Sequence, residues 1–328
     1  MKYPNFLTHN SQIGVVALSA GVGKYLDEYK KSLSNIEKYG FKVVETASVR
    51  SDSEPANTGE IRAKELDRLV TDPDIDFIMC ATGGDFLIEV LPFLNLSNIE
   101  KNPKWFMGAS DPTSILYLIT THLDIATIYG SNACSFDHEI LHQSEKNLFE
   151  IIQGNIVKQN SFSHYEKDKS QRTTGYALTE KVYWETLNGP VDIKGRIIGG
   201  CIDCLKDLIG TKFDYTKEFL NRYKEDGIIW YFDVFSLTSE DFYRTLLQFR
   251  EAGWFENTKG IIVGRVKYPN TFTELTYQDA LKKALKDSIP IIFNADIGHV
   301  APKMTIVNGS VAHITSENGK GAISFELR

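Results

Sequence analysis

Short apolar runs alternate with amphipathic stretches over about the first 130 residues, and this alternation restricts the fold more than any other feature of the sequence. The runs have the composition of buried strands and read IGVVALSA, FKVVETA and FIMCATGG. Between them, apolar residues recur at helical spacing from Leu26 to Tyr39 and from Ile61 to Val70. Strands that alternate with helices predict an α/β domain with an open, mostly parallel sheet and flanking helices.

A second series of strands and helices follows a polar, irregular stretch in the middle of the chain. GRIIGG, IIWYFDV, GIIVGR and IPIIFNADIGH predict strands, and helices are expected from Cys201, through Phe242 to Ala252 and near Ala280 to Leu285. The tail carries Asn-Gly pairs, which are the strongest local signal for hairpins. We therefore expect a second α/β domain with a small β-rich C-terminal part.

These patterns divide the chain into three parts. The polar middle, which could also cover a site, is a connecting segment between two α/β domains. The predicted parts are an N-terminal domain over 1–136, the connection over 137–190 and a C-terminal domain over 191–328.

One corner of the predicted first domain raises a question of function. In MGASDPTSILYL the strand ends at Gly108, and a helix opens at Pro112. A turn from strand to helix places its middle residue at the carboxyl edge of the sheet, with free backbone N–H groups beside it. Ser110 is then either a nucleophile or, like Asp111, a cap of the helix that follows.

Three other features also fall at the carboxyl ends of predicted strands, where ligands of open α/β sheets bind. His299 follows Gly298 in a loop, Asp233 ends the run IIWYF, and Gly83 and Gly84 end FIMCAT. His299 suits a general base and Asp233 its orienting carboxylate. The amides of the glycine pair suit donors to an oxyanion. The four residues equally suit a structural loop histidine, a helix cap and a tight turn.

Two short motifs suggest metal or redox chemistry instead. His138-Glu139-Ile140-Leu141-His142 matches H-E-x-x-H, in which two imidazoles one helical turn apart bind zinc in a metallopeptidase. No third ligand is evident at the expected spacing, and a long regular helix is not predicted there. Cys201 and Cys204 form a C-x-x-C, and no second pair completes a zinc site. Two packing cysteines one helical turn apart are favoured over a redox dithiol.

Composition excludes several classes of partner. The net charge of −7 and the pI of 5.6 argue against nucleic acid and anionic membranes. No apolar run reaches the ~18 residues that a membrane span needs. Four cysteines are too few for a disulfide framework in 328 residues and are typical of a reducing compartment, so we expect a soluble, cytoplasmic protein.

Taken in order, these segments resemble the LD-carboxypeptidase and microcin C self-immunity family of serine peptidases over nearly the whole chain. The resemblance rests on IRAKELDRLVTDPDIDFIMCATGG, GGDFLIEVLPFLNLSNIEKNPKWFMGASDPTSIL, GRIIGGCIDCLKDLIGT, IIWYFD and FNADIGHVAPKMTIVNG. The long polar middle is similar to that of the microcin immunity branch. The resemblance implies Ser110 as nucleophile, His299 as general base and Asp233 as triad carboxylate, with the backbone amides of Gly84 and Asp111 as oxyanion hole.

The chain departs from the family pattern at three positions. Asp233 stands where glutamate is usual, Ala109 where an aromatic residue is common, and Cys201 where asparagine is common. Because aspartate is one methylene shorter, His299 is expected to be held less well unless the backbone comes closer. The alternative interpretation is therefore a non-catalytic binder of small molecules on the same scaffold.

The hydrolase hypothesis has a defined substrate class. The resemblance implies cleavage of an amide bond in a small peptide, a murein peptide or a peptidyl- or aminoacyl-nucleotide-like molecule, without metal or other cofactor, by a homodimer. Gly83, Asp85 and Trp184 are further candidates for substrate binding. Trp184 and Tyr183 are expected either to stack on a flat substrate group or to pack the connection against the second domain.

Overall fold

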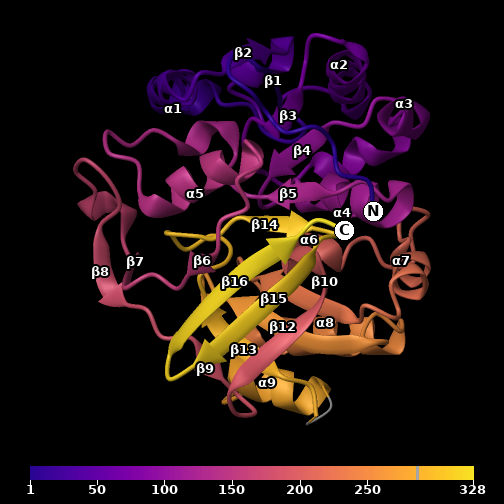
Figure 1. Cartoon of the computed structure of the whole chain (residues 1–328), viewed down its shortest axis with the longest axis vertical. Coiled ribbons are helices and arrows are strands. Elements are labelled where there is room, and N and C mark those ends of the chain that lie inside the picture. Colours follow the sequence, from indigo (N-terminus) through magenta and orange to yellow (C-terminus); the bar gives the residue numbers. More distant parts are fainter. Residues whose placement is uncertain (286–287) are drawn as a thin grey trace. The chain divides into compact units, whose positions relative to one another are not determined.

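The computed structural model describes residues 1–285 and 288–328 and divides the chain into two compact units (Figure 1). Unit 1 comprises Met1–Ile156 and Thr305–Asn308, and unit 2 comprises Val157–Met304 and Gly309–Arg328. The expected connection is shared between them, because residues 137–156 belong to unit 1 and 157–190 to unit 2. None of the helices in the described ranges is both long and apolar enough to cross a bilayer.

Unit 1 is built on a six-stranded sheet in the order β14-β5-β4-β3-β1-β2. The five strands from the N-terminal region are parallel, and β14 pairs antiparallel with β5. The strands are β1 (Gln12–Val16), β2 (Lys42–Glu45), β3 (Phe77–Cys80), β4 (Trp105–Gly108), β5 (Thr127–Tyr129) and β14 (Ile306–Asn308). The predicted open, mostly parallel sheet is confirmed.

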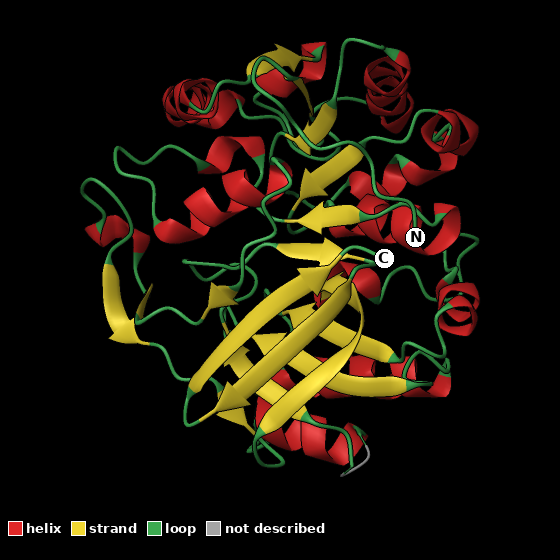
Figure 2. Ribbon diagram, in the orientation of Figure 1, coloured by secondary structure: helices red, strands yellow, loops and turns green. Residues whose placement is uncertain are grey.

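Helices cover both faces of the unit 1 sheet, as Figure 2 shows. Helices α1 and α5 share one face, where Tyr39 at the end of α1 stacks on Phe149 of α5 at 3.8 Å between ring centroids. Helices α2, α3 and α4 lie on the other face. Their bounds are α1 (Leu26–Lys38), α2 (Gly59–Thr71), α3 (Leu96–Lys101), α4 (Thr113–Leu123) and α5 (Gln143–Ile152). Between β3 and α3 the chain forms two short 3₁₀ helices, Leu87–Glu89 and Leu91–Phe93.

Unit 2 contains an eight-stranded mixed sheet in the order β6-β16-β15-β10-β11-β12-β13-β9. Its centre, from β10 to β13, is parallel, and the strands outside this centre pair antiparallel. The strands are β6 (Gln159–Asn160), β9 (Glu185–Thr186), β10 (Val191–Cys201), β11 (Ile228–Asp233), β12 (Thr258–Gly264), β13 (Ile291–Ala295), β15 (Val311–Glu317) and β16 (Lys320–Glu326). A separate hairpin pairs β7 (His164–Glu166) with β8 (Leu178–Lys181).

Helices pack against this second sheet and bury its central strand. They are α6 (Ile202–Leu205), α7 (Thr216–Arg222), α8 (Ser239–Glu251) and α9 (Tyr277–Ala284). Every residue of β11 is buried, and Trp230 stacks on Trp254 with ring centroids 5.6 Å apart. Phe249 of α8 lies 4.4 Å from the same indole. This apolar packing fixes β11, and with it the position of Asp233 at its end.

The two Asn-Gly pairs of the tail behave differently. Asn318 and Gly319 both have positive φ and join β15 to β16, so the hairpin predicted there is confirmed. The hairpin predicted at Asn308-Gly309 is wrong, because β14 pairs with β5 of unit 1 while β15 pairs with β10 of unit 2. The chain changes sheet at that glycine, which a local turn pattern does not reveal.

Candidate functional site

Ser110 lies at a strained corner of unit 1. Its φ of +71° falls in the left-handed region, which costs a residue with a side chain about 1 to 2 kcal/mol. The amide of Ser110 donates a hydrogen bond to the Tyr129 hydroxyl at 3.1 Å. Helix α4 takes Pro112 as its N-cap and has no side-chain cap, so the interpretation of Ser110 or Asp111 as the cap is wrong. Strain of this kind typically accompanies a functional position.

Residues that follow β5 hold this corner, and the sequence interpretation missed them. The Asn132 side chain accepts from the Ala109 amide at 2.9 Å and donates to the Ala109 carbonyl at 3.2 Å. Tyr129 supplies the hydroxyl that binds the Ser110 amide. Tyr129 ends β5 and Asn132 follows it shortly after, in the apolar run IATIYGS and the residue beyond it. The rule that places ligands at the carboxyl ends of strands therefore also points to them.

The glycine pair lies directly beside Ser110. A Cβ atom on Gly83 would come 3.2 Å from Ser110 Oγ, and one on Gly84, whose φ is +141°, would come 2.4 Å from Ser19 Oγ. Only glycine therefore permits this close approach. The amides of Gly84 and Asp111 donate no hydrogen bond to described residues and are available as oxyanion donors. We call Gly83, Gly84, Ser110 and Asp111 the serine corner.

The two aspartates next to the serine corner, Asp85 and Asp111, have different surroundings. Asp85 is exposed, and its amide donates to Glu54 Oε1 at 3.1 Å. The Asp111 side chain is buried and accepts from the Leu87 amide at 2.8 Å. Burial raises the pKa of Asp111 to about 6, although hydrogen bonds from Ser19 and Leu87 oppose the shift. Asp111 therefore fastens the 3₁₀ turn after the glycine pair to the corner that carries Ser110.

This shift predicts a pH dependence of stability. The pKa of Asp111 in the folded state exceeds the unfolded value of about 3.9, so ionisation of this carboxyl group opposes folding. The free energy of unfolding should therefore rise as pH falls from about 7 to about 4, where Asp111 becomes protonated. Asp111→Asn stays neutral, so its advantage in free energy of unfolding over wild type should grow by about 2 to 3 kcal/mol between about pH 4.5 and 7.5. Urea unfolding at each pH measures this, with exposed Asp85→Asn as control. Parallel curves for wild type and Asp111→Asn would contradict the assignment.

Unit 2 brings His299 and Asp233 together, and we call them the histidine pair. Asp233 ends β11 and is fully buried, while His299 lies in the loop after β13 with its side chain 18% exposed. His299 Nδ1 is 2.7 Å from Asp233 Oδ2, and the His299 amide donates to Asp233 Oδ1 at 3.1 Å. Nδ1 makes no hydrogen bond with the described residues, so its contact with Asp233 is an ion-pair distance. The Phe235 ring packs on the imidazole at 4.5 Å between centroids.

Gly298 explains how the shorter aspartate reaches the imidazole. Its φ is +96°, and a Cβ atom there would lie 2.1 Å from Asp233 Oδ1. The loop therefore runs against the carboxylate with no side chain between them. The backbone has come closer, so the missing methylene of Asp233 does not separate the two groups.

Adding a side chain at Gly298 should displace the histidine pair. Gly210 also has positive φ, at +77°, but a Cβ atom there would meet nothing within 4 Å, so it is a matched control for backbone strain alone. We expect Gly210→Ala to lower the free energy of unfolding by about 1 kcal/mol and Gly298→Ala by about 3 kcal/mol. Chemical denaturation measures both. Equal losses would show that the contact with Asp233 is not strained.

A buried ion pair anchors the histidine loop. Arg265, which follows β12, lies 2.7 Å from Asp296 Oδ1, and both side chains are buried. Trp184 Nε1 donates to Asp296 Oδ2 at 2.9 Å, and the Phe162 amide donates to the same oxygen at 3.0 Å. The Trp184 side chain is 0% exposed, so the structure places it in the core and not where it could stack on a ligand; Tyr183 is 63% exposed.

The metal and redox motifs take on structural roles. Residues 138–142 are not helical, so the imidazoles of His138 and His142 are not one helical turn apart, and the premise of the zinc-peptidase interpretation is wrong. His138 Nδ1 lies 3.2 Å from Glu145 Oε1, and His142 Nδ1 accepts from the Ser144 amide as the N-cap of α5. Cys201 ends β10 and Cys204 lies in α6, and neither forms a disulfide.

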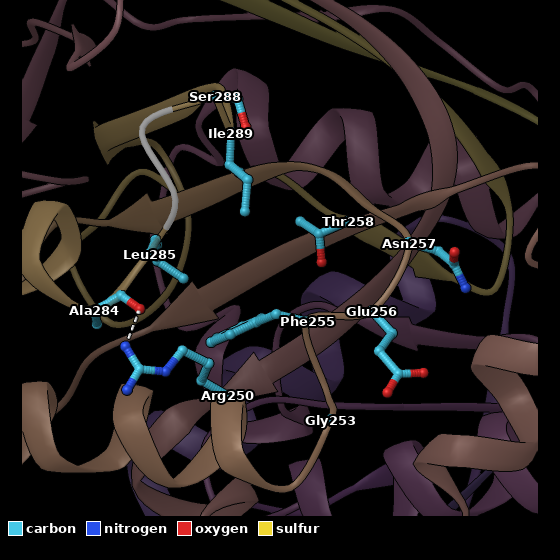
Figure 3. Close-up of a pocket in the computed structure, with 10 residues that line it drawn as sticks. All are labelled: Arg250, Gly253, Phe255, Glu256, Asn257, Thr258, Ala284, Leu285, Ser288 and Ile289. Atoms are coloured by element: carbon cyan, nitrogen blue, oxygen red, sulfur yellow. Dashed lines mark hydrogen bonds between the residues drawn. The ribbon is translucent and has the colours of Figure 1, made fainter.

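Unit 2 also has a pocket of about 560 Å³, shown in Figure 3, and the residues that line it do not include the histidine pair. It is lined by residues that lead into β12 and β13, including Asn257, Thr258 and Ile289. These are the amino ends of strands that run parallel to β11, whereas Asp233 is at a carboxyl end. The Arg250 guanidinium in it donates to the Ala284 carbonyl at 3.1 Å. We do not assign catalysis to this pocket.

Comparison with known proteins matches both halves of the chain to one family. Residues 13–130 match the LD-carboxypeptidase N-terminal domain and residues 194–314 match its C-terminal domain. The Escherichia coli microcin C7 self-immunity protein MccF is 24% identical, covering 89% of this chain and 86% of that protein. A Bacillus subtilis protein named "Probable murein peptide carboxypeptidase" is 23% identical, covering 94% and 90%.

A solved structure supports the same fold. MccF in complex with aspartyl sulfamoyl adenosine superposes with a TM-score of 0.84 over 99% of both chains at 23% identity. The serine corner lies within the matched N-terminal domain, and the histidine pair lies within the matched C-terminal domain. This protein belongs to the LD-carboxypeptidase family, which includes the microcin C7 immunity proteins.

Proposed function

We propose that this chain is a serine carboxypeptidase-like hydrolase that uses Ser110, His299 and Asp233. The observation that carries the proposal is the strained position of Ser110, held at positive φ beside two glycines that leave its hydroxyl uncovered. The histidine pair supplies the remaining groups of a Ser-His-acid triad. The proposal requires the serine corner and the histidine pair to meet, and this meeting is a prediction.

The proposed reaction proceeds in two halves. His299 takes the proton of the Ser110 hydroxyl as Oγ attacks the amide carbonyl, and the amides of Gly84 and Asp111 donate to the oxyanion that forms. His299 then gives the proton to the leaving amine, the C–N bond breaks, and Ser110 is left as an acyl ester. A water molecule, deprotonated by His299, attacks the ester and releases the acid. Asp233 holds the imidazole and stabilises its cationic form.

The substrate class follows from the family. The relatives include a protein named as a murein peptide carboxypeptidase and MccF, whose structure holds aspartyl sulfamoyl adenosine. We therefore propose that the substrate is a small peptide, a murein peptide or an aminoacyl- or peptidyl-nucleotide-like molecule cleaved at an amide bond. Homodimer formation and a cytoplasmic location are part of the same proposal.

A fluorophosphonate probe tests the nucleophile directly. An active triad should label at Ser110, as located by mass mapping of tryptic peptides, and heat-denatured protein should not label. Turnover is then measured on a murein tetrapeptide and on a peptidyl-sulfamoyl adenylate. Labelling at another serine, or none on folded protein, would contradict the proposal.

One observation favours a second candidate, a binder of the same ligands without catalysis. His299 Nδ1 and Asp233 Oδ2 are close, but Nδ1 makes no hydrogen bond with the described residues, and an imidazole without that bond is less firmly oriented than a good base requires. The binder should show saturable binding of an aminoacyl-sulfamoyl adenosine by calorimetry, with no labelling and no product release. The hydrolase should bind the ligand, label with the probe and release product.

A further inference from the structure

A thiol lies beside the histidine pair, at the position where the family commonly has asparagine. Cys201 and Asp233 are directly opposite each other in the register of β10 and β11, at the carboxyl ends of both strands. A ligand atom from each of Cys201, Asp233 and His299 lies within 4.8 Å of the other two. Cys201 and Asp233 are buried, and His299 is partly exposed.

The charges around this thiol favour a cation. Cys201 Sγ lies 3.7 Å from Asp203 Oδ2, to which it donates, so a second carboxylate stands behind the group. The hydrogen bond with Cys204, burial, and the charges of Asp233 and Asp203 all raise the pKa of Cys201, which keeps the thiol protonated while no cation is bound. A divalent ion would offset most of the negative charge that two carboxylates and a thiolate carry.

The partners of the group are already fixed in place. Asp203 accepts from the amides of Phe235, Ser236 and Leu237, at 3.0, 2.9 and 3.2 Å. Asp233 Oδ1 accepts from the His299 amide. His299 Nδ1 has no hydrogen bond with the described residues. The group thus has the outer hydrogen bonds that orient metal ligands, and one imidazole nitrogen without a hydrogen bond.

We propose that Cys201, Asp233 and His299 bind one Zn²⁺ ion and that this ion inhibits the enzyme. Thiolate, imidazole and carboxylate are the ligands zinc prefers, and tetrahedral bonds of about 2.0 to 2.3 Å place such ligand atoms about 3.3 to 3.7 Å apart. Small side-chain shifts therefore bring the group from its present spacing to that geometry. On binding, the thiol proton passes to solvent and the sulfur–zinc bond forms; the imidazole is then held by the metal and cannot serve as base. The inhibitory part rests on the proposed hydrolase function, whereas metal binding does not.

A zinc titration tests the site without any assay of activity. Purified full-length chain competes with a chromophoric zinc chelator, and we expect one ion bound per chain. Cys201→Asn, which restores the residue common in the family, should weaken binding by about tenfold or more, since even outer partners of a metal are worth about 10- to 100-fold. Cys204→Ser is the matched control, because it changes the neighbouring thiol and leaves all three ligands.

A spectroscopic readout and a second variant keep the result decisive. Co²⁺ bound at the site should give a thiolate-to-cobalt charge-transfer band that Cys201→Asn lacks. If the asparagine variant fails to fold, Cys201→Ala, which buries no new polar group, replaces it. Absence of zinc binding, or binding of equal strength in the Cys201 variant, would overturn the proposal and place any bound zinc elsewhere, such as at exposed His313.

The inhibitory effect is measured by fluorophosphonate labelling with and without zinc chloride. We expect zinc to slow labelling of wild type and of Cys204→Ser, and to leave Cys201→Asn unaffected. Equal slowing in the Cys201 variant would overturn the inhibitory part. A chain that never labels refutes the hydrolase proposal, while the titration still decides whether the metal site exists.

Discussion

Ser110→Ala is expected to lower turnover of the murein tetrapeptide or the peptidyl-sulfamoyl adenylate by about 10⁴- to 10⁶-fold, because the attacking oxygen is removed. Substrate binding should change little, since the amides of Gly84 and Asp111 and the histidine pair stay in place. Steady-state kinetics measure turnover, and calorimetry with the uncleaved analogue measures binding. The ratio of kcat to KM should therefore fall mainly through kcat.

The matched control is Ser97→Ala, which removes an exposed hydroxyl from α3 in the same unit. It should leave turnover and probe labelling unchanged. Thermal melting of Ser110→Ala checks that the corner still folds, because alanine must take the same positive φ. Equal rates of product release by wild type and Ser110→Ala would end the assignment of Ser110 as nucleophile.

Asp233→Asn should reduce turnover by about 10⁴-fold while the fold persists, because the amide favours the wrong tautomer of the imidazole and cannot stabilise its cation. The side chain keeps its size, and its carbonyl oxygen can still accept from the His299 amide, which now bonds Oδ1. Kinetics on the same substrates measure the loss. Unchanged unfolding by denaturant separates it from a loss of structure.

An exposed His-Asp contact in the same unit is the control for this change. His313 Nε2 lies 2.7 Å from Asp192 Oδ1, the same distance as in the histidine pair, but both side chains are largely exposed. Asp192→Asn should leave turnover within about twofold of wild type, since exposed pairs contribute little. Full activity in Asp233→Asn would favour a site in which His299 acts without its carboxylate.

Sequence periodicity was enough to predict the elements that carry the candidate residues. The strands before Gly83, Ser110 and Asp233 are short and apolar, so their positions follow from burial alone. The parallel arrangement then places their ends on one sheet edge in each unit. Family resemblance added the roles of Ser110 and His299, which a spacing rule cannot assign.

Other features depended on contacts between distant residues. Trp184 and Tyr183 are neighbours in an irregular segment, yet one is buried against Asp296 and the other is exposed. Local composition does not separate them, because the buried partner is 112 residues away. The same reason hides the change of sheet at Gly309, where β14 pairs with β5 and β15 pairs with β10.

The sequence by itself determined the α/β class, the strand ends and the candidate catalytic residues, because hydrophobic periodicity and turn chemistry act over a few neighbouring residues. Only the tertiary structure decided that Gly298 lets Asp233 reach His299, that Ser110 has positive φ without capping its helix, and that Cys201 faces the histidine pair. Each of these depends on close approach between strand ends far apart in the chain, and packing alone sets such distances.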